Sequence, residues 1–123
     1  MKFELKYLLL FVLFLPFSVK GQNNPKLAFQ KLTTSHGLSH STVYAITQDH
    51  KGFMWFGTRE GLNRYDSYKI KTYYADKHGS NGLTSNHITA LESGLGDTLL
   101  IGTANGLHLY DYQTDLITKI LFE

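Results

Sequence analysis

The sequence GLSHSTVYAITQDHKGFMWFGTREGLNRYD, residues 37–66, decides the fold because it recurs as GLTSNHITALESGLGDTLLIGTANGLHLYD, residues 82–111. The two stretches align without a gap, so that Gly37 corresponds to Gly82 at an offset of 45 residues. Both contain Gly-Leu, Gly-Thr, a second Gly-Leu and Tyr-Asp in the same register. Chance does not place so many identical residues in register, so the chain holds two copies of one structural unit.

Each copy is predicted to contain four short strands separated by turn residues. The segment Asp49–Gly52 ends in Gly, as a short hairpin requires, and Asn105-Gly106 predicts a type I′ turn because both residues tolerate a positive φ. Gly57 and Gly102, each at the end of a second strand, predict a close backbone approach or a bulge. The expected strands are residues 43–48, 53–57, 62–65 and 68–74 in the first copy and 88–92, 98–102, 107–110 and 116–122 in the second.

Apolar side chains occupy both faces of these strands. In the first strand, Tyr44 and Ile46 lie on one face, and Val43 and Ala45 lie on the other. A sheet with water on one side would alternate apolar and polar residues, so both faces are expected to be covered by other sheets. Repeated four-stranded units covered on both faces predict an all-β fold made of β-propeller blades.

The N-terminus is typical of a secretory signal peptide. Lys2 and Lys6 precede an apolar run over residues 7–17, and small residues come before a cleavage site at Gln22. The run is shorter than the roughly 20 residues that a membrane-spanning helix needs. We therefore expect residues 1–21 to be removed on export.

The charge and cysteine content of the remaining chain exclude several classes of partner. Of the 12 Lys and Arg residues three lie in residues 1–21, and of the 10 Asp and Glu residues one does, which leaves nine of each. A balanced charge without a basic cluster argues against nucleic acid as a partner of this segment. The chain has no Cys, so disulfides, a lipid-modified Cys and Cys-based zinc sites are excluded. No cofactor is expected.

The segment GFMWFGTREGLNRYDSYKIKTY resembles the two-component regulator propeller repeat. The second copy departs from the family pattern at Leu100, which stands where the first copy has the tryptophan Trp55, and at Gly94, which stands where the first copy has the acidic residue Asp49. The residues of the first copy that match the pattern are Ile46, Asp49, Gly52, Trp55, Gly57, Thr58, Gly61, Leu62, Tyr65 and Asp66.

The resemblance implies an extracytoplasmic ligand-sensing propeller, in which an oligosaccharide or another small molecule binds. It further implies a periplasmic location and a longer parent protein, anchored in the inner membrane, that is a sensor histidine kinase and dimerises only at full length. This chain itself carries no kinase motif, so it is not expected to be an enzyme. A secreted propeller enzyme such as a lyase, or a periplasmic binding scaffold, is the alternative.

The expected organisation is a signal peptide at 1–21, a lead-in at 22–36, and propeller repeats at 37–81 and 82–123. The lead-in is expected to contain a strand at residues 26–32 that closes the ring. A propeller needs about four to eight blades, so the two repeats are expected to need further blades of a parent protein. A truncated gene or an incomplete gene model would account for the rest.

The loops that join strand four to strand one, and strand two to strand three, open on the same face of a propeller, around its channel. Their short polar side chains suit sugar hydroxyls, which donate and accept hydrogen bonds, although ordinary loop tips would have the same composition. The candidate ligand-binding residues in these loops are His40, Ser41, Arg59, Glu60, Asn86, His87 and Asn105.

Other chemically capable residues are given structural roles. His36 and His40 are spaced as metal ligands on a helix would be, but Gly37 between them argues against a helix, and no metal site is expected. Trp55 is expected to pack in the core rather than to stack on a sugar. The acidic residues Asp49, Glu60, Asp66 and Asp111 are expected to stabilise turns rather than to form an acid and base pair.

Residues 22–123 alone are expected to fold poorly, because missing blades would leave apolar side chains uncovered. The side chains expected to be exposed are Phe53, Trp55, Phe56 and Tyr65. The segment is therefore predicted to aggregate or to be a loosely packed monomer.

Overall fold

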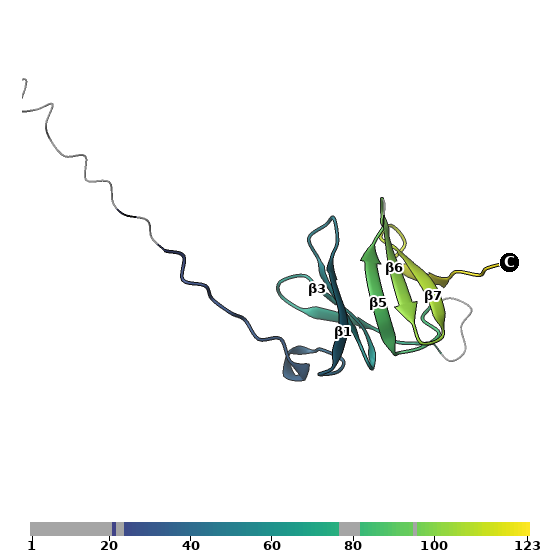
Figure 1. The fold of residues 1–123 in the computed structure, drawn as a ribbon, viewed down its shortest axis with the longest axis horizontal. Coiled ribbons are helices and arrows are strands. Elements are labelled where there is room, and N and C mark those ends of the chain that lie inside the picture. The colour runs from purple at the N-terminus through teal and green to yellow at the C-terminus, as the bar shows by residue number, and fades with distance from the viewer. Residues whose placement is uncertain (1–20, 22–23, 77–81, 95) are drawn as a thin grey trace, which may run out of the picture.

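The structure, a computed structural model, describes residues 21, 24–76, 82–94 and 96–123 (Figure 1). The predicted signal peptide, apart from Gly21, lies outside the described residues. Among the described residues no helix is long and apolar enough to cross a membrane. The helical content of this part of the chain is one 3₁₀ turn, Thr34–His36.

The fold is all-β, as the repeat predicts. Each repeat forms one antiparallel sheet in which consecutive strands are neighbours. The first sheet consists of β1 (Val43–Gln48), β2 (Met54–Thr58), β3 (Gly61–Tyr65) and β4 (Ile70–Tyr73). The second consists of β5 (Ile88–Ser93), β6 (Thr98–Thr103), β7 (Gly106–Asp111) and β8 (Leu116–Lys119).

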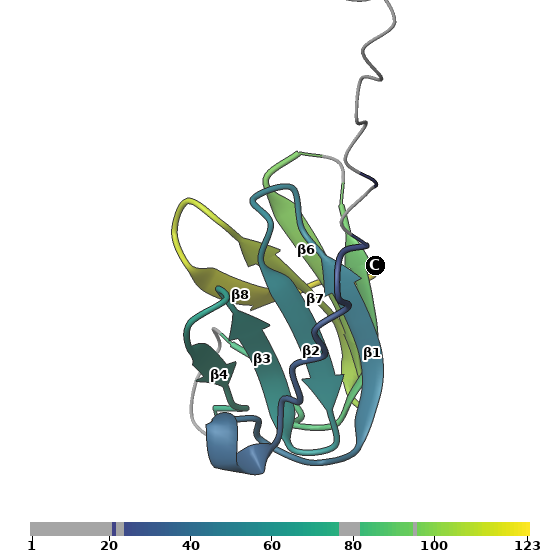
Figure 2. The same ribbon diagram turned by 90° about the vertical axis from the view of Figure 1, so that its left-hand side faces the viewer.

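The two sheets pack face to face as adjacent propeller blades. Figure 1 shows them side by side with β1 and β5 nearest each other, and Figure 2 shows the first sheet in front of the second. Within each blade, paired residues point to the same side of the sheet. We call the side that carries Trp55 and Gly57 the front face of the first blade, and the side that carries Met54 and Phe56 its back face.

The same register defines the faces of the second blade. Its front face carries Leu100 and Gly102, and its back face carries Leu99 and Ile101. The seam between the blades joins the front face of the first to the back face of the second, since Trp55 contacts Tyr110 with ring centroids 4.9 Å apart. The buried hydrophobic core lies in this seam. Its buried members are Trp55, Leu62, Leu83, Ile88, Leu99, Ile101, Tyr110 and Ile117.

Gly57 permits the close approach of the two blades. A Cβ atom at this position would lie 2.6 Å from Cγ2 of Ile88, a distance that real Cβ atoms do not adopt. The ladder also shifts register between Val43 and Ala45, opposite Gly57. The second blade has the same shift between Ile88 and Ala90. The predicted close approach is therefore confirmed at Gly57, and a bulge lies opposite the second-strand glycine in both blades.

The last strand of each blade is shorter than predicted. β4 begins at Ile70 rather than residue 68, because Ser67 has a positive φ of 77° and Asp66 Oδ1 accepts hydrogen bonds from the backbone N–H groups of Tyr68 and Lys69. This turn occupies the residues that would otherwise pair. β8 ends at Lys119 instead of residue 122.

The predicted type I′ turn at Asn105-Gly106 is wrong. Ala104 and Asn105 form the turn, and only Gly106, with φ 117°, takes a positive φ there. The hydroxyl of Thr103 donates to Gly106 O at 3.0 Å and accepts from the N–H of Asn105 at 3.1 Å. A threonine thus closes the turn.

Thr58 closes the equivalent turn of the first blade. Its hydroxyl donates to Gly61 O at 2.9 Å and accepts from the N–H of Glu60 at 3.1 Å. This shared geometry explains why both copies contain the Gly-Thr pair three residues before the next Gly. We expected the side chain of Glu60 to stabilise this turn. In the structure the hydroxyl of Thr58 makes the two hydrogen bonds that close it.

The lead-in does not form the predicted strand. Residues 26–32 have no strand pairing and are mostly exposed, and Figure 1 shows the segment running away from the two sheets. A strand at a ring closure needs the last blade as a partner for its backbone N–H and C=O groups, and the described residues form two sheets that do not pair with this segment. Its role in closing the ring stays a prediction.

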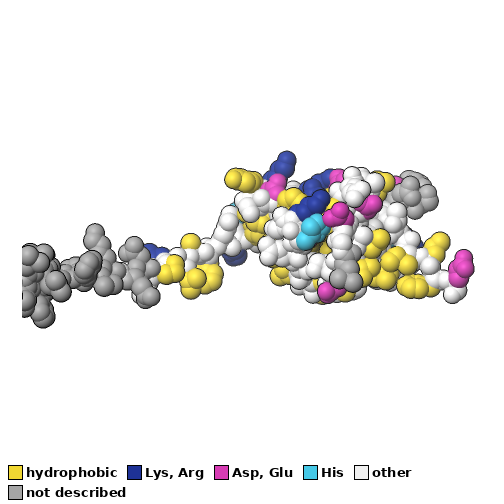
Figure 3. All heavy atoms as spheres, turned by 90° about the horizontal axis from the view of Figure 1, so that it is seen from above, with side chains coloured by type: hydrophobic (Ala, Val, Ile, Leu, Met, Phe, Trp, Pro, Cys, Tyr) yellow, Lys and Arg dark blue, Asp and Glu magenta, His cyan; other side chains and the backbone are white. Residues whose placement is uncertain are grey.

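The outer faces of the two-blade unit are partly open. Ile46 is 59% exposed, because no sheet of the described residues covers this face. The expectation that further blades cover it stays a prediction. Phe53, Phe56 and Tyr65 are half-buried rather than exposed as expected, and Trp55 is fully buried because the second blade covers it. Figure 3 shows hydrophobic side chains gathered toward the end where the C-terminus emerges.

Candidate functional site

Two sets of loops meet at one end of the blades. In the first blade, the N–H of Arg59, in the β2–β3 turn, donates to Thr42 O at 3.2 Å, just before β1. In the second blade the N–H of Ala104 donates to His87 O at 2.9 Å at the equivalent position. We call this end, formed by residues 39–42, 59–60, 84–87 and 104–105, the loop end. It is the end that the repeat predicts to surround a channel.

The structure places the seven candidate residues at the loop end, with different degrees of exposure. Ser41, Arg59, Glu60 and Asn105 are exposed at loop tips. The other three are half-buried: His40, Asn86 and His87.

Two of the half-buried candidates already have structural partners. Asn86 Oδ1 accepts a hydrogen bond from the N–H of Ala75 at 2.6 Å, which ties the end of the first blade to the start of the second. His40 Nδ1 accepts from the N–H of Thr42 at 2.9 Å. That bond leaves Nε2 of a neutral His40 as the ring's proton carrier and donor.

Sequence reasoning missed Tyr44 as a site residue, because it counted the side chain as buried. Tyr44 sits at the register shift of β1 and stacks on His87 of the second blade, with ring centroids 5.0 Å apart and an interplanar angle of 31°. The two rings form a half-exposed aromatic surface that bridges the seam at the loop end. A bulge opposite Gly57 changes the direction of the Tyr44 side chain, so the bulge that the sequence allows there could have predicted that Tyr44 is not buried.

A buried polar residue on the third strand supports each loop. In the first blade Asn63 Oδ1 accepts from the N–H of Ser39 at 2.9 Å, and Asn63 Nδ2 donates to Ser39 Oγ at 2.8 Å. In the second blade His108 takes this place, and its Nε2 accepts from the N–H of Thr84 at 3.2 Å. These hydrogen bonds fix the Gly-Leu-Ser segment at 37–39 and the Gly-Leu-Thr segment at 82–84 to the third strand of their own blade. The loops that follow these segments are thereby held in place.

His108 is less well satisfied than Asn63. It is fully buried, its Nδ1 has no hydrogen-bond partner among the described residues, and burial together with the charge of Lys119 lowers its pKa below the usual 6.5. The imidazole is therefore neutral near pH 7, which leaves Nε2 free to accept from Thr84.

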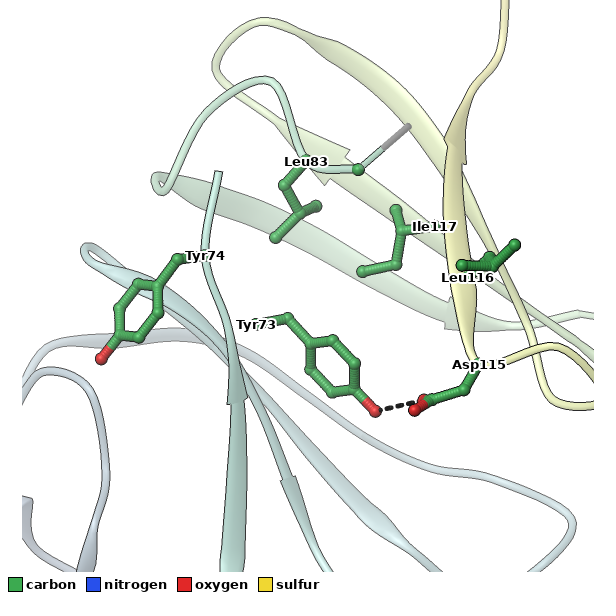
Figure 4. A pocket seen from close by; sticks show the side chains of 7 residues that line it. Tyr73, Tyr74, Leu83, Asp115, Leu116 and Ile117 are labelled. Carbon is green, nitrogen blue, oxygen red and sulfur yellow. Dashed lines mark hydrogen bonds between the residues drawn. The ribbon is translucent and has the colours of Figure 1, made fainter. Parts of the chain in front are cut away.

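A second cluster joins the outer strands of the two blades, away from the loop end. Asp115 accepts hydrogen bonds from Lys71 and from Tyr110 OH at 2.9 Å, and Arg64 Nη1 lies 3.8 Å from Asp115 Oδ1. It also accepts a hydrogen bond from Tyr73 OH at 2.8 Å (Figure 4). Burial alone would raise the pKa of Asp115, but these hydrogen bonds outweigh burial and lower the pKa from 3.8 to about 2. The ionised carboxylate of Asp115, in the second blade, is thus held by hydrogen bonds from Lys71 and Tyr73 of the first blade.

Beside Asp115 lies a small open cavity of about 200 Å³. None of the seven candidate residues borders it. Its lining residues are Tyr73, Tyr74, Gly82, Leu83, Asp115, Leu116 and Ile117 (Figure 4). Burial, followed by the hydrogen bond to Asp115, raises the pKa of Tyr73 above its usual value of 10, so its hydroxyl stays protonated and donates.

The remaining sequence assignments have structural outcomes. Trp55 is in the core, as predicted, and His36 ends a short 3₁₀ turn in which its Nδ1 lies 2.8 Å from Thr33 Oγ1. No group of three or more His, Cys, Asp or Glu side chains that could hold a metal ion occurs among the described residues. Asp49 and Asp111 each accept backbone N–H bonds in turns, as expected.

Comparisons with known proteins show which proteins the chain is similar to. The family model described as two component regulator propeller matches residues 37–60. Histidine kinase P4 of Formosa agariphila is 39% identical over 71 residues, which cover 58% of this chain and 5% of that protein. The chain therefore spans a small part of the curated relative that it matches.

A solved structure matches the fold and the sequence. The extracellular domain of a protein assigned as a hybrid two component system from B. thetaiotaomicron has a TM-score of 0.71 and 34% identity, over 76% of this chain and 13% of that one. Both the repeat motif and the paired four-stranded sheets are thereby accounted for. The chain is thus similar in sequence to the two component regulator propeller repeat, and its two sheets are similar in sequence and fold to part of the extracellular domain of a hybrid two component system.

Proposed function

We propose that these two blades belong to an extracytoplasmic propeller that senses an oligosaccharide or a similar small molecule and passes the signal to a histidine kinase in the same parent protein. The similarity to a histidine kinase and to an extracellular domain supports this assignment. In this proposal the two blades bind and position the ligand but catalyse no reaction. The full-length sensor acts as a dimer.

The observation that carries the proposal is the Tyr44–His87 stack at the loop end. It offers a flat, half-exposed aromatic surface on which the apolar face of a sugar ring packs. Exposed Arg59, Glu60 and Asn105 lie in the turns of the same end and supply donors and acceptors for hydroxyl groups. An aromatic surface edged by polar loop residues suits a neutral or weakly charged glycan.

The ligand-binding half of the proposal is tested on the propeller-containing ectodomain of the parent protein. The probes are defined neutral oligosaccharides of two to six sugar units, titrated by calorimetry. Tyr44→Ala removes the aromatic surface and is expected to weaken binding by about three- to tenfold. Arg59→Ala removes a polar partner and should also weaken it.

The matched control is Lys69→Ala, an exposed residue in the β3–β4 turn at the other end of the blade. It should leave affinity unchanged. Equal effects of Tyr44→Ala and Lys69→Ala, or no change with either, would show that the ligand does not bind at the loop end.

The proposed periplasmic location is tested separately. Residues 1–40 are fused to a reporter that is active only outside the cytoplasm, and the fusion should be active. Replacing Leu9, Leu10 and Val12 with Asp should abolish activity, because a signal peptide needs an apolar run. Activity of both fusions, or of neither, would contradict export.

A further inference from the structure

We infer that His108 is a positioning residue for the loop end: its neutral imidazole holds residues 84–87 in place, and a proton on the imidazole releases them and weakens ligand binding. The second half of this role rests on the proposed function, because it takes the loop end as the ligand-binding surface. It makes that surface sensitive to pH. The first half, the hold on residues 84–87, requires no ligand.

His108 lies in the seam between the two blades. Its strand partners are Ile101 on β6 and Lys119 on β8, so its side chain lies on the back face of the second blade, which the first blade covers. The described residues bury it fully. Its burial therefore needs no further blade.

Thr84 connects His108 to two of the candidate ligand-binding residues. Its backbone N–H donates to His108 Nε2 at 3.2 Å, and its hydroxyl donates to Asn105 O at 3.0 Å. Farther along the same segment, the N–H of His87 donates to Ser85 Oγ at 3.2 Å. We therefore expect a displacement of Thr84 to reach Asn105 in one loop and His87 in the other.

His87 would carry this displacement to the aromatic surface of the loop end. Its ring stacks on Tyr44, with ring centroids 5.0 Å apart. We expect the movement to be confined to residues 84–87, because Leu83 and Ile88 on either side are buried in the core. The stack should thus change while the two blades stay packed.

The contact with Thr84 requires an unprotonated Nε2. In the neutral ring with its hydrogen on Nδ1, Nε2 is an acceptor, whereas both nitrogens of the charged ring are donors. A hydrogen on Nε2 would point at the N–H of Thr84, which would lose its acceptor. The charged ring can still donate to Thr84 Oγ1, 3.1 Å away, but the backbone N–H stays unpaired. The segment should therefore shift away from a protonated His108.

The surroundings of His108 determine the pH at which this happens. Burial is the main cause that lowers its pKa below 6.5, and the charge of Lys119 lowers the pKa further. The backbone of Gly106, on β7, and of Ile101, on β6, acts in the opposite direction. Burial outweighs the backbone, so half of the rings are protonated only below pH 6.5.

The first blade makes the equivalent contact without a group that titrates. Asn63 stands at the position of His108, and its Oδ1 accepts from the N–H of Ser39 at 2.9 Å. Histidine changes its charge in the range of about pH 5 to 8, whereas an amide does not. Only one half of the loop end, residues 84–87, should therefore respond to pH, while residues 39–42 should not.

Hydrogen exchange on the propeller-containing ectodomain of the parent protein tests the hold on residues 84–87 without a ligand. Protection factors, which correct for the pH dependence of free exchange, are measured at pH 7.5 and pH 5. Protection of residues 84–87 should fall by about fivefold or more at pH 5, the effect of one unpaired buried N–H. Protection of residues 39–42 should not change.

His108→Asn is the decisive variant, because it copies the first blade and does not titrate. It should keep the protection of residues 84–87 at both pH values. Folding is checked in the same data by the protection of β6. If His108→Asn loses the protection of β6, His108→Gln replaces it, since its amide also offers an acceptor and takes up no proton.

Calorimetry with the same neutral oligosaccharides of two to six sugar units tests the effect on binding. The affinity of the unaltered ectodomain should fall by about fivefold or more between pH 7.5 and pH 5. His108→Asn should bind as the unaltered ectodomain does at pH 7.5 and should lose this pH dependence. A residue that served folding alone would not change the pH profile of binding.

Two further variants separate His108 from the other histidines. Lys119→Gln removes a charge that opposes protonation of His108, so the loss of affinity should begin at a higher pH. His50→Gln is the matched control, because His50 lies between β1 and β2, at the end of the blade opposite to the loop end. It should leave the pH profile unchanged.

The outcomes distinguish the role of His108 from the proposed function. Unchanged protection of residues 84–87 at pH 5, or an equal loss in His108→Asn, would overturn the positioning role. If protection behaves as expected but no oligosaccharide binds at either pH, the proposed function fails while the hold of His108 on residues 84–87 is supported. If binding has the same pH dependence with and without His108, its effect on the ligand is refuted while the proposed function stands.

Discussion

Trp55 Nε1 donates a hydrogen bond to Asp49 Oδ2 at 2.7 Å, and both side chains are buried. The other carboxylate oxygen of Asp49 accepts from the N–H groups of Lys51 and Phe53, both at 2.9 Å. One carboxylate therefore closes the β1–β2 turn and fixes the indole that fills the seam. This bond explains why the acidic residue and the tryptophan occur together in the first repeat and are both replaced in the second, where Gly94 and Leu100 stand.

The first prediction concerns this bond. Asp49→Ala removes the acceptor of three buried or half-buried donors and leaves the indole N–H unsatisfied, so it should lower the free energy of unfolding by about 3 kcal/mol. Urea denaturation at one fixed protein concentration measures the loss, because association would shift the apparent stability. A loss below about 0.5 kcal/mol, the range of ordinary surface changes, would contradict the role assigned to Asp49.

A double-mutant cycle separates the indole bond from the turn. Asp49→Asn keeps one acceptor oxygen for the turn but turns an N–H₂ donor toward the indole N–H, whereas Trp55→Phe removes the indole donor. Asp49→Asn should therefore cost less in the Trp55→Phe background than in the unaltered chain. Equal costs in both backgrounds would mean that the 2.7 Å contact contributes nothing to stability.

The second prediction concerns the approach of the blades. Gly57→Ala places a Cβ 2.6 Å from Ile88 Cγ2, so the seam must widen, and the free energy of unfolding should fall by about 1–3 kcal/mol. Because Ile88→Ala removes that methyl group, the double variant should be more stable than the two separate losses predict. Thermal unfolding monitored by Trp55 fluorescence measures all three variants.

Gly102→Ala is the control for this prediction. The nearest atom to its Cβ would be Ala90 Cβ at 3.2 Å, which belongs to the same blade, and no other sheet of the described residues covers this face. Its cost should therefore be smaller than that of Gly57→Ala. If the losses in the free energy of unfolding caused by Gly57→Ala and Ile88→Ala add up in the double variant, the two positions do not interact.

The repeat made the fold predictable, and local turn chemistry limited the detail. Eight strands, their order and the close approach at Gly57 follow from residues that recur at one offset. The start of β4 does not, because Asp66 and Ser67 form a turn whose length depends on which backbone N–H groups the carboxylate captures. The pKa of Asp66 is correspondingly lowered by the N–H groups of Lys69 and Tyr68.

The candidate site was predictable only in outline. Topology brings the two sets of loops to one end, which a repeat of four strands dictates. The stack of Tyr44 on His87 depends on how two sheets are turned relative to each other, and the spacing within one strand carries no such information. The tie at Asp115 was missed for the same reason, since its partners Lys71 and Tyr73 come from the other blade.

The third prediction concerns acid stability. The pKa of Asp115 is about 2 in the folded chain against 3.8 as the reference, so its carboxylate stabilises the fold above about pH 4. That stabilisation is lost as the pH falls from about 4 toward 2, when the unfolded chain binds the proton first. Asp115→Asn should make the fall in melting temperature over this range shallower. The effect is modest, because the side chain is 45% exposed.

Glu123→Gln is the control for the acid prediction, because it removes one carboxylate at the exposed C-terminus without touching the seam. As the pH falls from about 4 toward 2, the melting temperature of this variant should fall in parallel with that of the unaltered chain. If Asp115→Asn also runs parallel, then the hydrogen bonds from Lys71, Tyr73 and Tyr110 do not favour the ionised form of Asp115 in solution.

The fourth prediction exchanges the buried polar residues of the two blades. Asn63 Nδ2 donates to Phe56 O at 3.2 Å, whereas Nδ1 of His108, at the equivalent position, has no partner among the described residues. His108→Asn should therefore keep the acceptor for Thr84 and gain a donor, and it should match or exceed the stability of the unaltered chain at pH 7.5. The reverse exchange, Asn63→His, should lower the free energy of unfolding by about 1–3 kcal/mol, because it leaves a buried group unsatisfied.

The pH dependence of the same variant gives a second, independent reading of His108. Its pKa in the folded chain is lowered, mainly by burial, so the unfolded chain binds a proton first as the pH falls below about 6.5. The unaltered chain should therefore lose stability between pH 7.5 and pH 5, and His108→Asn should lose less. The melting temperatures of both chains at the two pH values decide the matter, and equal losses would mean that folding does not lower the pKa of His108.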